Sequence, residues 1–142
     1  MLPDLHLATA LIKVEFDAVF VQFYNNPSCA ASMWPRVANG TDVNEGFNFG
    51  QWDAWVKSKS RNKYLKVFLS LPASAKVATA GGYVASRTAA DIIAGVANYT
   101  SFAGVALWDA SEAAIDPGFV HTVKKALDKL SPVKGGYRHR RF

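Results

Sequence analysis

Three short apolar runs stand out along the chain, over residues 17–23, 64–71 and 103–108. Each run is rich in Val, Phe and Leu, and polar and apolar positions alternate little within it. This pattern is typical of strands that are covered on both faces, as the strands of parallel sheets are. We therefore predict three buried, parallel strands.

Helical periodicity fills the segments around these strands, over residues 5–14, 47–60, 86–99 and 116–130. In the second segment the apolar side chains form one helix face, which we expect to belong to the core: Phe49, Trp52, Trp55 and Val56. Ser86 is a suitable N-cap for the third helix. Asp116 followed by Pro117 is a suitable start for the fourth.

This alternation of helices and strands predicts right-handed β-α-β units. Such units build either an open, doubly wound sheet or part of a (β/α)8 barrel, and the pattern leaves both open. The chain has 142 residues, 50% of them hydrophobic, which suits the core of one domain. Because a complete barrel takes about 250 residues, a barrel interpretation means that the chain holds less than one. The fold class is α/β in either case.

The formal net charge of +5 is concentrated at the C-terminus. The last nine residues carry four of the 16 Lys and Arg and no acid, so the rest has 12 basic and 11 acidic residues. We interpret residues 1–131 as the folded domain and 132–142 as a basic, disordered tail, with polyanion binding as the alternative. No apolar run reaches the roughly 18 residues of a membrane span, and no signal peptide is visible. We expect neither a nucleic acid nor a membrane as partner of the domain.

Polar and aromatic side chains cluster where the first strand ends, at Gln22, Tyr24 and Asn25. Ligands of parallel α/β folds bind at the carboxyl ends of the strands, so these residues are candidate binding residues. A Tyr hydroxyl donates a hydrogen bond and a Gln amide donates and accepts, so the pair could hold an amide or a hydroxyl. The alternative for Tyr24 is a core ring whose hydroxyl bonds to a backbone carbonyl.

The third strand ends in Trp108, whose flat indole suits the apolar face of a sugar ring. Packing in the core is the alternative. Asp109 and Glu112 follow as a candidate acid and base pair. A helix-capping or solvated pair is the alternative for these two carboxylates.

Other features exclude several kinds of site. Cys29 is the single cysteine, so no disulfide can form within the chain, and the spacing of the three histidines does not resemble a metal site. We expect no metal and no cofactor. The segment TAGGY, residues 79–83, is interpreted as a turn before a helix and not as a phosphate loop. Glycosylation sequons at Asn39 and Asn98 fit a secreted surface.

The motifs VQFYNNP before Cys29, FNFGQWDAW, FLSLPAS, AGGYV and GVALWD follow one another at spacings that resemble a known family. They are similar to the class III, plant- and fungal-type chitinases among the family 18 glycoside hydrolases. The resemblance runs from about Pro3 to about Leu130 and covers only the C-terminal half of that family's barrel. It implies a partial (β/α)8 TIM barrel made of the sixth, seventh and eighth strands, and an extracellular destination.

The resemblance implies hydrolysis of chitin or chitooligosaccharides by a retaining, substrate-assisted mechanism. In that mechanism the N-acetyl carbonyl of the substrate attacks its own anomeric carbon while an enzyme glutamate protonates the leaving oxygen. By resemblance, Tyr24 steadies the acetamido group, Trp108 forms the floor of the cleavage subsite, and Gln22 and Asn25 line the cleft. We expect Tyr24 and Trp108 to open into one sugar-sized hollow.

The chain departs from the family at the proton donor. The family's acid ends a D-x-x-D-x-D-x-E motif, and none of Glu15, Glu45 and Glu112 ends such a motif. Because a general acid contributes roughly 10² to 10⁴ in rate, we expect no meaningful turnover from this chain alone. The resemblance also pairs Cys29 with a cysteine that would fall just before Met1, so we expect a truncated chain.

Three hypotheses follow. The first is a chitinase fragment whose exposed strand edges and inner face need a missing N-terminal half-barrel, or another copy, to cover them. The second is a non-catalytic chitin- or carbohydrate-binding module. The third is an unrelated small α/β protein with a tail that binds nucleic acid.

Overall fold

A computed structural model describes residue 4 and residues 6–34 and 46–130. The three predicted strands are present as β1 (Ala18–Gln22), β2 (Lys66–Pro72) and β3 (Phe102–Trp108). They form one sheet in the order β1-β2-β3, and both pairings are parallel, so the parallel α/β prediction is confirmed. The tail, Glu45 and the sequon at Asn39 lie outside the described residues.

Helices form in all four predicted segments. They are α1 (Ala8–Lys13), α2 (Phe49–Ser58), α3 (Ser86–Val96) and α5 (Pro117–Asp128). Three short elements have too few residues for hydrophobic periodicity to reveal them: the helix α4 (Ala110–Ile115) and the 3-10 turns η1 (Ala31–Met33) and η2 (Ala75–Val77). Two of these, η2 and α4, follow strand ends and therefore shape the carboxyl edge of the sheet.

Of the two predicted helix starts, the one at α5 is confirmed and the one at α3 is not. At α5 the prediction is confirmed, because the Asp116 carboxylate accepts a hydrogen bond from the Phe119 backbone N–H at 3.0 Å and Pro117 is the first helical residue. At α3 the prediction is wrong. The extended residue before the helix is Ala85, and Ser86 already lies inside the first turn, where its side chain caps nothing.

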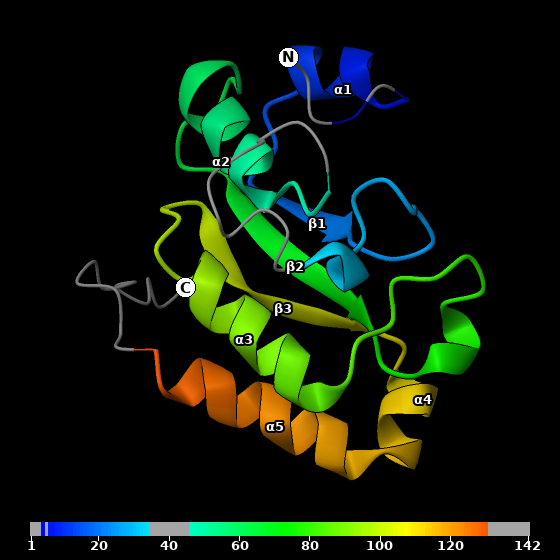
Figure 1. The fold of residues 1–142 in the computed structure, drawn as a ribbon. Helices are drawn as coiled ribbons and strands as arrows, with labels where there is room; N and C mark the ends of the chain where they lie inside the picture. Colours follow the sequence, from blue (N-terminus) through cyan, green and yellow to red (C-terminus); the bar gives the residue numbers. More distant parts are fainter. Residues whose placement is uncertain (1–3, 5, 35–45, 131–142) are drawn as a thin grey trace, which may run out of the picture.

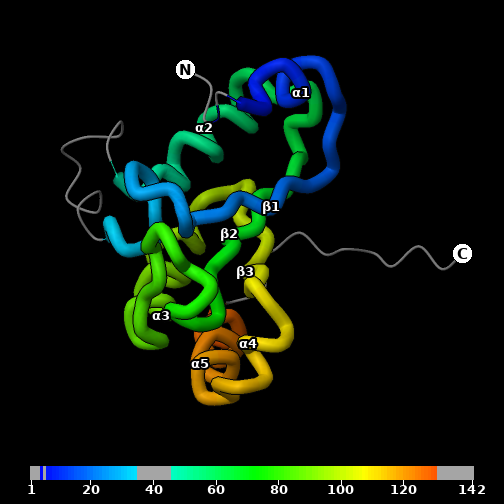
Figure 2. The backbone as a smooth tube through the Cα atoms, turned by 90° about the vertical axis from the view of Figure 1, so that its right-hand side faces the viewer, coloured from blue at the N-terminus to red at the C-terminus, as the bar shows by residue number. Residues whose placement is uncertain are grey.

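The helices α2 and α3 lie on one side of the sheet, with α5 packed against α3, and none of the three lies on the other side (Figures 1 and 2). The face of α2 predicted to be core is buried, which confirms the prediction for Phe49, Trp52, Trp55 and Val56. A one-sided helical layer follows from right-handed β-α-β connections that all turn the same way around a sheet.

Alternate residues of each strand point to the two faces of the sheet. In β2, Val67, Leu69 and Leu71 are fully buried under the helical layer. The register places Phe20, Phe68 and Gly104 side by side on the other face. There the Phe20 and Phe68 rings stack with centroids 4.6 Å apart, yet the Phe20 side chain is 62% exposed. We name the face of the sheet that carries Phe20, Phe68 and Gly104 the open face.

A buried carboxylate ties the helical layer to the sheet. Asp53 of α2 accepts hydrogen bonds from the backbone N–H and the hydroxyl of Ser101, at 3.0 and 2.8 Å, directly before β3. Its other oxygen pairs with Lys57 at 2.5 Å. Burial opposes ionisation of Asp53, but the bonds from Lys57 and Ser101 outweigh it and hold the pKa below its ordinary value.

Candidate functional site

The carboxyl edge of the sheet gathers the predicted site residues at one level. Gln22 pairs with Ser70, Ser70 with Ala106, and Pro72 with Trp108. Tyr24 follows two residues beyond Gln22, after the last paired residue of β1, at the same end of the sheet as Pro72 and Trp108. Neighbouring strands lie about 4.8 Å apart, so the ends of β1 and β3 are separated by roughly 10 Å, or two strand spacings.

Tyr24 is buried, with only 4% of its surface exposed. Among the residues that the structure describes, none forms a hydrogen bond with its hydroxyl. Burial raises the pKa of this phenol, so the group stays a neutral O–H donor across the physiological range. The core alternative, in which the hydroxyl bonds to a backbone carbonyl, therefore finds no acceptor within the described part of the chain.

Asn25 follows with a left-handed backbone, at φ 56°, a conformation that Asn tolerates better than most residues. Its side-chain amide donates to the Val77 carbonyl at 3.2 Å, and its side-chain oxygen accepts from the Ala80 N–H at 2.9 Å. Its own backbone N–H donates to the Gly81 carbonyl at 2.8 Å. Asn25 thus binds the segment between β2 and α3, while its predicted contact with substrate stays a prediction.

A hollow of about 530 Å³ lies along the free edge of β1. Gln22, Tyr24 and Asn25 line it, together with Asn48 and Trp52 of the α2 region. The side-chain oxygen of Asn48 is buried there and has no hydrogen-bond partner among the described residues. Trp108 does not line this hollow. The structure thus brings three of the four predicted site residues together and leaves the fourth two strands away, so this hollow is not the one that we expected Tyr24 and Trp108 to share.

Trp108 ends β3 with its side chain 52% exposed on the open face, so the core alternative does not apply. Its backbone carbonyl accepts a hydrogen bond from the Ala73 N–H at 2.8 Å, which extends the ladder with β2 by one bond. Its chain neighbour Asp109 is the N-cap of α4. Hydrogen bonds therefore hold the backbone at and directly after Trp108, while its indole is partly exposed.

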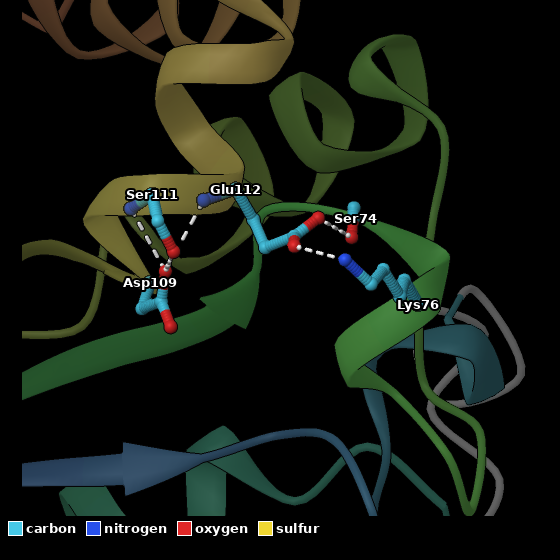
Figure 3. Close-up of polar contacts among 5 residues, drawn as sticks. All are labelled: Ser74, Lys76, Asp109, Ser111 and Glu112. Carbon is cyan, nitrogen blue, oxygen red and sulfur yellow. Dashed lines mark hydrogen bonds and ion pairs between the residues drawn. The ribbon is translucent and has the colours of Figure 1, made fainter.

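Asp109 and Glu112 form a polar cluster with the segment after β2 (Figure 3). The Asp109 carboxylate accepts hydrogen bonds from the Ser111 and Glu112 backbone N–H groups at 2.8 and 3.1 Å, which confirms the capping alternative. Glu112 is only 8% exposed, and its two oxygens accept from the Ser74 hydroxyl at 2.7 Å and from Lys76 Nζ at 3.1 Å.

These bonds decide what the two carboxylates can do. Hydrogen bonds from Ser111 and from the Glu112 N–H hold the pKa of Asp109 below its ordinary value. Hydrogen bonds from Ser74 and Lys76 do the same for Glu112. A general acid needs a raised pKa so that it keeps its proton at the working pH. Neither carboxylate is suited to protonate a leaving group.

Other candidate groups lie apart from this edge. Cys29 is a free, half-buried thiol whose pKa is raised by burial and by the nearby Asp4 carboxylate. Glu15 lies before β1, at the opposite end of the sheet, and is exposed. Within residue 4 and residues 6–34 and 46–130, no group of three His, Cys, Asp or Glu is placed to hold a metal ion. No helix in this part is long and apolar enough to cross a bilayer.

No family model matches this chain. The class III chitinase of Arthroderma benhamiae is 38% identical over 126 residues, which are 88% of this chain and 37% of that protein. Chitinase 2 of Rhizopus oligosporus is 39% identical over 118 residues, which are 82% of this chain and 19% of that protein. The chain belongs to the class III chitinase family. It spans little more than a third of the length of its class III relative.

A solved structure extends the likeness to the fold of this family. A xylanase and α-amylase inhibitor protein, determined in complex with trehalose, superimposes with a TM-score of 0.64 at 28% identity. The match covers 88% of this chain and 41% of the inhibitor protein. The relatives therefore carry names of both catalytic and inhibitory proteins, so membership of the chitinase family does not by itself decide the chemistry of this chain.

The sequence did not predict two features of this chitinase-family site. The turn at residues 79–83 is confirmed, but Gly82 also packs against the first strand: a Cβ added there would lie 2.6 Å from the Tyr24 Cα. Ser74 and Lys76 bind Glu112 across 38 and 36 residues of sequence. The adjacent glycines at 81 and 82 could have indicated the close backbone contact, whereas no local sequence pattern predicts the bonds of Ser74 and Lys76 to Glu112.

Proposed function

We propose that this chain is the C-terminal part of a chitinase barrel, contributing its sixth to eighth strands, and that it supplies Tyr24 and Trp108 to a cleft for N-acetylglucosamine polymers. One observation carries the proposal. A parallel sheet with helices on one face brings to its carboxyl edge a half-exposed Trp and a Tyr whose hydroxyl has no hydrogen-bond partner among the described residues. This is where barrel enzymes bind substrate.

The chemistry that fits is substrate-assisted hydrolysis with retention. A neutral phenol can donate a hydrogen bond to the acetamido oxygen and hold that group against the anomeric carbon. Tyr24, whose pKa is raised by burial, keeps its proton for this purpose. An indole half-exposed at the same edge offers a surface for the apolar face of the sugar.

Three carboxylates of the described residues are unsuited to be the proton donor. Asp109 and Glu112 are held ionised by their hydrogen bonds, and Glu15 lies at the far end of the sheet. We therefore propose that the chain alone has no meaningful turnover and that a complementary N-terminal half-barrel supplies the acid. Exposed Phe20, the free edge of β1 and the unpartnered Asn48 side-chain oxygen favour such a partner, because each would gain a contact from it.

A complementation assay tests this function. The chain is mixed with a polypeptide that carries the first five strands of a class III chitinase, and hydrolysis of chitooligosaccharides is measured. We expect no hydrolysis from this chain alone and measurable hydrolysis from the mixture. Tyr24→Phe in the mixture should lower the rate about 10²-fold or more, the cost of losing one preorganised donor.

Tyr64→Phe is the matched control, because Tyr64 is 86% exposed and lies before β2, away from the carboxyl edge. It should leave the restored rate unchanged. Hydrolysis by the chain alone would overturn the claim that its acid is missing. A restored rate that Tyr24→Phe leaves intact would overturn the role given to the phenol.

A second candidate function is a non-catalytic carbohydrate-binding module. The exposure of Trp108 favours it, and a structural relative was solved with a disaccharide, trehalose. The prediction is retention on chitin beads that Trp108→Ala abolishes and that Ile115→Ala, a change at another exposed apolar residue, does not. Retention of the chain without restored hydrolysis in the mixture would favour this function over the first.

A further inference from the structure

The segment from Ala73 to Gly82 runs between the two residues of the proposed cleft. At its start, the Ala73 N–H donates to the Trp108 carbonyl at 2.8 Å. At its end, Gly82 packs against the Tyr24 backbone so closely that a Cβ would lie 2.6 Å from the Tyr24 Cα. One short segment therefore contacts both Trp108 and Tyr24, which lie on opposite sides of β2.

The first end of this segment is anchored by Glu112. Its carboxylate accepts from Ser74 and Lys76, while its backbone N–H donates to the Asp109 carboxylate, next to Trp108 (Figure 3). Glu112 thus joins the corner after β3 to the segment after β2. Lys76 itself is exposed, so the buried member of the pair is the carboxylate.

The second end is anchored by Asn25. Its amide binds the Val77 carbonyl and the Ala80 N–H, and its backbone N–H donates to the Gly81 carbonyl. These three bonds take both polar atoms of the side chain. Asn25 directly follows Tyr24 in the sequence. In the same way Asp109, which Glu112 binds, directly follows Trp108.

We propose that residues 73–82 act as a spacer that sets the separation and orientation of Tyr24 and Trp108, with Glu112 and Asn25 as the positioning residues at its two ends. The proposal rests on the proposed function only in giving Tyr24 and Trp108 a shared ligand. Two separately anchored ends make the spacer stiff, since a loop held at one end alone would let its other end drift. A misplacement of about 1 Å between binding groups is enough to weaken a site substantially.

The test labels the four tryptophans with 5-fluorotryptophan and records fluorine NMR spectra of the full chain. Trp108→Phe assigns the Trp108 resonance by its loss. Glu112→Ala should shift or broaden that resonance and leave those of buried Trp52 and Trp55 in place. Asn25→Ala should also move it, although Asn25 lies on the far side of β2. Glu112→Gln, which keeps one acceptor, should move it less than Glu112→Ala.

Asp128→Ala is the matched control, because it removes an exposed carboxylate paired with Lys124 on α5. It should leave all four resonances unchanged. A Trp108 resonance that stays in place in Glu112→Ala and Asn25→Ala, with the core resonances intact, overturns the proposal. If Glu112→Ala unfolds the chain, Lys76→Ala replaces it, since Lys76 is exposed and its loss frees only one anchor.

A second readout separates this proposal from the proposed function. In the mixture with the N-terminal half-barrel, the affinity for an N-acetylglucosamine oligomer should fall about ten-fold in Glu112→Ala and in Asn25→Ala, a loss expected when two binding groups lose their alignment. If the chain mixed with the N-terminal half-barrel binds no oligomer, the proposed function fails while the fluorine spectra still decide the spacer. If Asn25→Ala lowers affinity without moving the Trp108 resonance, Asn25 contacts the sugar directly and is no anchor.

Discussion

The two faces of the sheet differ in how far this chain completes them. On the helix-covered face, Val67, Leu69 and Leu71 are fully buried. On the open face, Phe20 and Trp108 are 62% and 52% exposed, although they belong to the strands that neighbour β2 in the same sheet. Every β-α-β connection places its helix on the first face (Figure 2). The chain therefore places most of its buried apolar residues on one side and its candidate binding residues at the edge of the other.

This difference explains how a chain that spans little more than a third of the length of its class III relative has a defined fold. Burial of apolar surface is the main source of stability, and the helical layer supplies it without help from the open face. The open face then keeps aromatic side chains that an isolated domain has no reason to expose. Variants on the two faces should accordingly separate stability from binding.

The largest effect is expected on the covered face. Leu69→Ala should lower the free energy of unfolding by about 3 kcal/mol, because it removes a fully buried side chain and leaves a cavity. Urea unfolding followed by circular dichroism measures it. Ile115→Ala, at an exposed aliphatic side chain, is the control and should change the midpoint little. Equal losses in both variants would contradict the one-sided core.

Next comes the junction between the spacer and Tyr24. Gly82→Ala should cost about 2 kcal/mol, because φ is +98° and the new Cβ would meet the Tyr24 backbone. Gly81→Ala is a close control, since its φ is +94° and no atom lies within 4 Å of its added Cβ. It should cost about 1 kcal/mol from backbone strain alone. Thermal unfolding of both variants compares them, and equal losses would show that the contact adds nothing.

A smaller effect is expected on acidification. Hydrogen bonds from Ser74 and Lys76 lower the pKa of folded Glu112 from its ordinary 4.5, so the unfolded chain binds this proton more readily than the folded chain does. The stabilisation is complete above pH 4.5 and is lost as the pH falls through the lowered value. Asp53 on the covered side and Asp109 behave in the same direction.

Glu112→Gln isolates this contribution, because it removes the ionisable group and keeps the size of the side chain. The melting temperature of the variant, measured from about pH 3 to about pH 7, should fall less steeply in acid than that of the unmodified chain. Asp128→Ala should leave the acid slope close to that of the unmodified chain. Parallel curves for Glu112→Gln and the unmodified chain would mean that Glu112 is not held ionised by its partners.

The smallest effect on stability is expected on the open face. Phe20→Ser should change the free energy of unfolding by less than about 1 kcal/mol, since the ring is mostly exposed and keeps only its stacking on Phe68. It should also reduce binding of a hydrophobic dye, because one apolar patch becomes polar. A loss as large as that of Leu69→Ala would show that the open face is part of the core.

Local signals predicted much of the fold. The three strands, the buried face of α2 and the Asp116 cap at α5 are confirmed, because each depends on residues close in sequence. The predicted start of α3 was wrong, because Ser86 is as acceptable within the first helical turn as at the position before the helix. The short helix α4 has too few residues to show a period.

The candidate site was only partly predictable. The sequence alone determined that Gln22, Tyr24, Asn25 and Trp108 would come to the carboxyl ends of parallel strands, since the strand pattern places them there. Only the tertiary structure decided that Asn25 binds the spacer, that Glu112 joins two loops, and that Trp108 does not line the hollow beside Tyr24. The first two outcomes depend on contacts between residues 36 to 55 positions apart, and no local pattern carries such contacts.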